Sequence, residues 1–221
     1  MSNFDSDGSS ENQWEDRGEL AWNEFDWERY LREQDELLRR YQELYDACPE
    51  AADRLDRVAE QMNWGSSDWS EEGEADEGAE GEKESADVYT VYKNPIFIAT
   101  KAISRSLRTG WEALSADPAR VPQPLAVALL SAFQRCEDQA LQGVHALDFG
   151  DYAMAVSLFK RALSQLNGCL ALLGDEAVAP LPEVGAWRTE AVRRCFDLRE
   201  IWLRVIAECR DELSRPHDDE S

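Results

Sequence analysis

Apolar residues recur every three to four positions along most of this chain, and the strict alternation typical of β-strands is nearly absent. The most regular series lies near the end of the chain, in a predicted helix of about 29 residues: Trp187, Ala191, Cys195, Leu198, Trp202, Val205, Cys209 and Leu213. Similar series predict helices over Pro95 to about Ser115, about 124–148 and about 151–173. The pattern therefore predicts an all-α fold in which residues 95–214 form an antiparallel bundle of about four helices.

The helix ends of this bundle carry local signals. Asn94 and Pro95 form a favoured N-cap and first helical residue. Gly150 suits the C-terminal end of one helix, and Asp151 can cap the next. These signals fix the expected boundaries to within a few residues.

The first third of the chain predicts a shorter helical pair. A helix is expected from Glu19 to about Ala47, and Pro49 fits the first turn of a second helix. The apolar positions of the pair are Trp27, Leu31, Leu38, Tyr41 and Tyr45, then Leu55, Val58, Ala59 and Met62. We expect an acidic, aromatic helical hairpin over residues 18–64. Because it is short and rich in acids, it needs another surface to pack against.

Composition changes abruptly between the hairpin and the bundle. Residues 65–87 consist mainly of Gly, Ser, Ala and acids, which predicts an acidic disordered linker. Residues 1–17 and 216–221 are also expected to be disordered. The bundle domain is expected to cover 88–215, and Val88–Tyr92 forms a short strand or an extended lead-in.

Charge is distributed very unevenly. The first 87 residues contain 28 acidic and 8 basic residues, a net charge of −20, whereas the remainder contains 18 and 15, a net charge of −3. A total of −23 disfavours direct binding to nucleic acid or to anionic lipid. The longest apolar run, Pro124 to Phe133, is about half of what a bilayer span requires. With no signal peptide visible, a cytoplasmic protein without membrane contact is expected.

Few residues suit catalysis or metal binding. The five cysteines are widely spaced and lack a Cys-x-x-Cys pair, and four lie on apolar helix stripes, which predicts buried, reduced thiols. The chain has two histidines and none of the common nucleophile, phosphate-binding or zinc motifs. We expect no enzymatic activity, no cofactor and no bound metal. An enzyme whose site is built from dispersed carboxylates is the alternative.

Acid-flanked tryptophans are the candidate partner-binding residues. Such a segment is similar to peptides that bind basic grooves, where the indole fills a pocket and the carboxylates steer the approach. Trp27 has acidic neighbours too, but its place in a helical stripe favours a role in the core. The candidates outside packed elements are Trp14 and Trp69, the latter with Asp68, Glu71 and Glu72.

A basic stripe accompanies the apolar face of the helix that follows Pro95. Lys101, Arg105 and Arg108 are spaced by four and three residues, so they lie on one side of that helix. The stripe is either a solvated helix face or a dock for an acidic partner, including this chain's own residues 68–87. Self-docking predicts a hydrodynamic radius that grows when salt is raised.

The turn near Gly150 resembles the second half of a tetratricopeptide repeat, with the pattern Gly150, Tyr152, Ala155, Phe159, Ala162 and Leu163, and with Gly143 as the small residue of the preceding helix. The resemblance covers residues 139–167. Gln139 and Gln142 replace bulky apolar residues of the family, and no second copy appears at a 34-residue offset in either direction. The resemblance implies a protein-binding groove without catalysis. A single hairpin that obeys general helix-packing rules is the alternative.

Together these features favour a non-enzymatic interaction or adaptor protein. Its acidic, tryptophan-containing arm is expected to bind a protein partner with a basic surface, with the bundle as a platform. The alternative is a chaperone or inhibitor that mimics a polyanion and occupies the site of a nucleic-acid-binding protein. The aromatic face of the first helix also leaves room for a homodimer.

Overall fold

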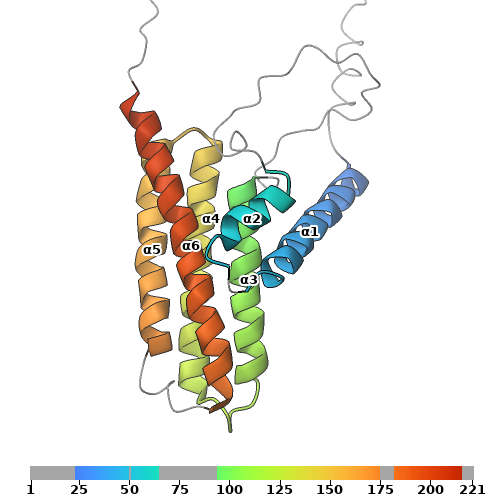
Figure 1. Cartoon of the computed structure of the whole chain (residues 1–221), viewed down its shortest axis with the longest axis vertical. Helices are drawn as coiled ribbons and strands as arrows, with labels where there is room; N and C mark the ends of the chain where they lie inside the picture. The colour runs from blue at the N-terminus through green and yellow to red at the C-terminus, as the bar shows by residue number, and fades with distance from the viewer. Residues whose placement is uncertain (1–22, 50, 65–93, 175–181, 216–221) are drawn as a thin grey trace, which may run out of the picture. The chain divides into compact units, whose positions relative to one another are not determined.

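The computed structural model describes residues 23–49, 51–64, 94–174 and 182–215, and every regular element in these ranges is an α-helix (Figure 1). The prediction of an all-α fold is therefore confirmed. The helices are α1 (Glu24–Asp46), α2 (Arg54–Gln61), α3 (Pro95–Ser115), α4 (Gln123–Asp148), α5 (Tyr152–Gly174) and α6 (Pro182–Ser214). The segments expected to be disordered, 1–17, 65–87 and 216–221, lie outside the described residues, as does Val88–Tyr92.

Helices α3 to α6 form the predicted antiparallel bundle. Each packs on two others, α3 on α4 and α6, and α5 on α4 and α6. Figure 1 shows the four helices side by side, with the chain reversing direction from each to the next. The apolar stripes meet in the middle, where the largest fully buried side chains of the bundle include Trp111, Leu129, Phe159, Leu166, Leu198 and Trp202.

Local signals determine the helix ends of the bundle as expected. The side chain of Asn94 accepts a hydrogen bond at 2.8 Å from the backbone N–H of Ile96. Gly150 has a φ of 72°, which suits a residue that ends a helix. Asp151 Oδ1 accepts from the N–H of Met154 at 2.9 Å and caps α5. The three predicted caps are confirmed.

Close packing between α4 and α5 depends on Gly143. A Cβ atom at this position would lie 3.0 Å from the ring of Phe159, so only glycine lets the two helices approach this closely without a shift. The thiols expected on apolar stripes are also found there, since Cys136, Cys169, Cys195 and Cys209 are all buried.

Three helix starts differ from the prediction. The first helix begins at Glu24, not Glu19, because Asn23 is outside the helix and caps it. Helix α2 begins at Arg54 and does not include Pro49, whose carbonyl accepts from the Arg54 guanidinium at 3.5 Å. Helix α6 begins at Pro182, slightly earlier than expected, because proline is well suited to a first helical position.

The chain divides into two units inside α1, one ending at Leu37 and the other starting at Leu38. The C-terminal part of α1 and all of α2 thus belong to the same unit as the bundle, and Tyr41, Tyr45 and Val58 are buried there. Within the ranges that the structure describes, none of the helices combines the length and apolar character needed to cross a membrane.

Candidate functional site

The N-terminal part of α1, residues 24–37, is an acidic surface with exposed apolar side chains. Asn23 starts the helix through a reciprocal cap: its Oδ1 accepts from the N–H of Phe25 at 2.8 Å, and its own N–H donates to Asp26 Oδ2 at 3.1 Å. The side chains of Phe25, Trp27 and Leu31 are 76%, 46% and 45% exposed. Trp27 and Leu31 are four residues apart, so they lie one turn apart on one face of the helix.

Charge on this surface is strongly negative. Residues 24–37 contain six acids and two arginines, a net charge of −4. Arg32 Nε pairs with Glu28 at 2.8 Å and Arg29 pairs with Asp26 at 3.4 Å, so both arginines contact acids of their own helix. The six acids of this segment outnumber its two arginines, which gives the surface its excess of negative charge.

This combination of groups is suited to binding rather than to bond chemistry. An exposed indole with a leucine one turn away can fill an apolar pocket of another protein. The surrounding carboxylates can pair with lysines and arginines at the edge of that pocket and favour approach of a basic protein. The acidic aromatic surface, defined as residues 24–37, is therefore the candidate functional site.

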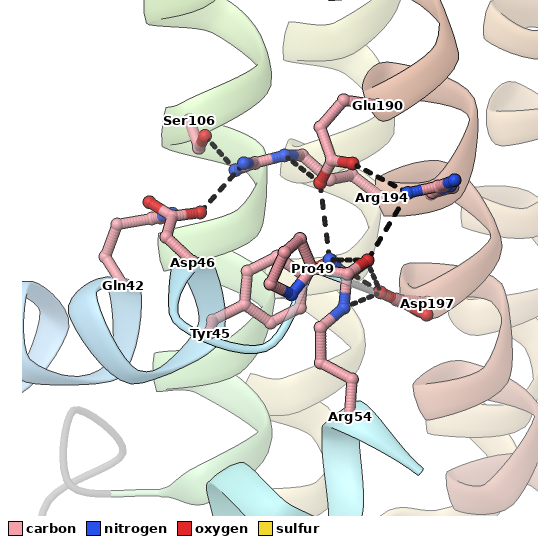
Figure 2. Close-up of polar contacts among 10 residues, drawn as sticks. Gln42, Tyr45, Asp46, Pro49, Arg54, Ser106, Glu190, Arg194 and Asp197 are labelled. Atoms are coloured by element: carbon pink, nitrogen blue, oxygen red, sulfur yellow. Dashed lines mark hydrogen bonds and ion pairs between the residues drawn. The ribbon is translucent and has the colours of Figure 1, made fainter. Parts of the chain in front are cut away.

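A polar cluster in the other unit joins the end of α1 and the start of α2 to α6 (Figure 2). The Tyr45 hydroxyl donates to Asp197 Oδ2 at 2.5 Å, and Arg54 donates from Nε to the same oxygen at 3.0 Å. The Arg54 guanidinium also lies over the Tyr45 ring, 4.0 Å from its centroid. Arg54 Nη1 also donates to Glu190 Oε1 at 3.3 Å.

A second arginine extends this cluster to α3 and α1. Arg194 Nη2 contacts Asp46 Oδ1 at 2.8 Å, its Nε contacts Glu190 at 3.2 Å, and its Nη1 donates to Ser106. These side chains come from α1, α2, α3 and α6 and point toward one another (Figure 2). The cluster thus contains two arginines, three carboxylates and two hydroxyl groups. Each charged group in it has more than one partner.

The pKa values of Tyr45 and Arg54 indicate that this cluster has a structural role. Burial and the neighbouring Asp197 carboxylate raise the pKa of Tyr45 far above its ordinary value, so its hydroxyl remains a hydrogen-bond donor. Burial alone would lower the pKa of Arg54, but Tyr45, Asp197 and Glu190 outweigh that effect and raise it. Because both groups are held in their protonated forms, neither acts as a general base at neutral pH.

The predicted basic stripe is partly engaged by an acid from the neighbouring helix. Lys101 Nζ lies 2.8 Å from Glu137 Oε1, and Arg108 Nε lies 3.2 Å from Glu137 Oε2. Glu137 itself is buried between them on α4. Arg105 is exposed. The three basic residues share one helix face as expected, and a dock for an acidic partner there stays a prediction.

Several predicted partner-binding residues, Trp14, Trp69, Asp68, Glu71 and Glu72, lie outside the described residues. Sequence reasoning missed Trp27 and Leu31, because their place in a helical stripe favoured burial. The acids on either side of Trp27, Asp26 and Glu28, were the sequence signal that could have identified it. In the described ranges no group of three or more histidines, cysteines or acids could hold a metal ion.

Comparison with protein-family models, with curated protein sequences and with solved structures gives no match. The fold shows that the chain is an all-helical protein with an antiparallel bundle. The resemblance of residues 139–167 to a tetratricopeptide hairpin stays a prediction.

Proposed function

We propose that this chain is a non-catalytic interaction protein that binds a protein partner with a basic surface. The observation that carries the proposal is the exposure of Trp27 and Leu31, one turn apart, on a helix segment whose net charge is −4. The indole and the leucine would enter an apolar pocket of the partner, while the acids around them pair with its lysines and arginines. Trp14 and Trp69 would extend the same contact.

The bundle serves as the platform for this contact. Tyr45, Asp46 and Arg54 tie the C-terminal part of α1 and the start of α2 to α6. Deleting residues 1–87 would therefore remove buried side chains such as Tyr45 and Val58 together with the acidic surface. Point substitutions in the full chain are the cleaner test.

The test compares two double variants of the full chain as baits in affinity purification. The first, Trp27→Ser with Leu31→Ser, removes the exposed apolar residues of the acidic aromatic surface. The matched control is Phe196→Ser with Leu203→Ser on α6, where the side chains are 54% and 42% exposed. Partners that carry a net positive charge should be lost from the first variant and kept by the control.

Salt and competition complete the experiment. Recovery of these partners should fall steeply between low and high salt, because charge steers the contact. Equal recovery with both variants, or recovery that salt leaves unchanged, would refute the proposal. Displacement of one recovered partner by DNA would identify the polyanion-mimicking alternative.

A further inference from the structure

A small pocket lies among α1, α2, α3 and α6, within the unit that contains the bundle. Its volume is about 120 Å³. The apolar lining comes from Leu55, Ala59, Ala99 and Ile201. Tyr41 and Trp64 add aromatic surface, and their rings stack with centroids 5.6 Å apart and an interplanar angle of 21°.

Three charged residues also line this pocket, and their charges do not balance. Arg204 already has two acidic partners, since its Nη1 lies 2.5 Å from Asp56 Oδ1 and its Nε 3.0 Å from Glu200 Oε1. Glu208 stands one turn beyond Arg204 and adds a further carboxylate to the lining. Partial burial raises the pKa of Glu208, although Arg204 acts in the opposite direction. Glu208 is nevertheless exposed, so a cation that approaches from solvent can reach its carboxylate, and the three charged residues of the lining carry a net charge of −1.

The volume of the pocket and the charge of its lining together indicate which side chain fits it. A cavity of about 150 Å³ holds a benzene ring, so this pocket has room for a four-carbon chain and one further heavy atom but not for an indole. Lysine matches this description, because its stem is apolar and its ammonium group is a compact point charge. The flat guanidinium of arginine is wider, and a neutral side chain would gain nothing from the net negative charge of the lining.

We propose that this pocket receives a lysine side chain of the partner protein. The four methylene groups would contact Ile201 and the Tyr41–Trp64 pair, and the ammonium group would donate to the Glu208 carboxylate. The inference rests on the proposed function in one respect, that a partner with a basic surface supplies the lysine. It gives the bundle a binding role of its own, separate from the acidic aromatic surface.

Nuclear magnetic resonance on the full chain tests this site directly. The probes are N-acetyl-lysine-N-methylamide and N-acetyl-norleucine-N-methylamide, which share the four-carbon stem and differ in the ammonium group. The lysine probe should give saturable shifts of the Trp64 indole N–H and of the Ala99 and Ile201 amides. The norleucine probe should bind about tenfold more weakly, since it lacks a charged hydrogen bond. Equal binding of both probes, or no saturable shift, would overturn the proposal.

Two variants and one matched control keep the test decisive. Glu208→Gln should weaken binding of the lysine probe about tenfold for the same reason. Glu112→Gln removes the same charge from an exposed position on α3 and should change nothing. Ala59→Leu keeps every charge but fills the pocket and should abolish binding. Undiminished binding by Glu208→Gln or by Ala59→Leu would contradict the assignment.

These measurements need no partner protein, so they separate the pocket from the proposed function. Loss of the basic partners from the Trp27 and Leu31 variant, without binding of the lysine probe, would leave the function standing and refute the pocket. A pocket that binds the lysine probe, in a chain that retains its partners in Glu208→Gln, would refute the partner as the source of the lysine.

Discussion

Arg54 and Asp197 lie 143 positions apart in the sequence, yet Arg54 Nε donates to Asp197 Oδ2 at a distance of 3.0 Å. The guanidinium is buried, and the Tyr45 hydroxyl donates to the same carboxylate oxygen. Removing one member of a buried ion pair leaves the other charge without compensation, and this costs more than the pair itself contributes. The contact is therefore one of the interactions that hold α2 against α6, together with the Asp56–Arg204 pair.

Breaking this pair should destabilise the protein. We expect Arg54→Ala to lower the free energy of unfolding by about 2–3 kcal/mol, because Asp197 and Glu190 lose their buried cation. Urea unfolding followed by circular dichroism measures the effect. The control is Arg57→Ala on the same helix, whose pair with Asp53 is half exposed, and it should leave stability nearly unchanged. Equal effects of the two changes would argue against a special role of Arg54.

The two glycines Gly143 and Gly168 should respond in opposite ways to alanine. Gly143→Ala places a methyl group 3.0 Å from the Phe159 ring, and the resulting overpacking should cost about 1–3 kcal/mol. A methyl group at Gly168, inside α5, would have no atom of a neighbouring residue within 4 Å, so Gly168→Ala should stabilise by about 0.5–1 kcal/mol. Thermal unfolding of both variants gives the comparison. If Gly143→Ala were stabilising, α4 and α5 would have to move apart at no cost to make room for the methyl group.

Stability should fall in alkaline solution because of Tyr45. The pKa of its hydroxyl is raised in the folded protein, so the folded state retains a proton that the unfolded state loses above about pH 10. The stabilisation is complete below that pH and decreases as pH rises, by up to about 1.4 kcal/mol per pH unit. Tyr45→Phe keeps the ring but removes the titrating group, so its stability should fall less steeply above pH 10. Parallel pH profiles for the two proteins would refute this assignment.

Glu137 should stabilise the bundle through Lys101 and Arg108. Glu137→Gln removes the buried charge that these two residues share, and we expect a loss of about 1–2 kcal/mol. The neighbouring Asp138 is exposed, so Asp138→Asn serves as the control and should have little effect. In the Lys101→Met background the effect of Glu137→Gln should become smaller, which a double-mutant cycle measures. Strict additivity would show that Lys101 and Glu137 do not interact.

Features that depend on a few neighbouring residues were predictable. Asn94 and Asp151 cap their helices through backbone groups two or three positions away, and Gly150 ends a helix through its own backbone angle. The helical stripes were also predictable, because a period of 3.6 residues is visible in any window of the chain. Pro49 was misassigned because its carbonyl contacts Arg54 and Arg193, and the latter belongs to α6.

Features that depend on distant segments were not predictable. Trp27 and Tyr41 belong to one apolar stripe, yet one is exposed and the other is buried. Periodicity tells which face of a helix is apolar, but it does not tell how much of that face a neighbour covers. Glu137 was likewise invisible as the partner of Lys101 and Arg108, because their contact requires α3 and α4 to pack in one particular register.

The sequence by itself determined that the chain is helical, where most of its helices end and that its negative charge is concentrated in the first 87 residues. Those properties follow from local backbone hydrogen bonds and from composition. Only the tertiary structure decided which apolar residues stay exposed on α1, which charges pair inside the bundle and where a pocket remains. The physical reason is that burial and ion pairing depend on distances between helices, and these are set by the packing of the whole core.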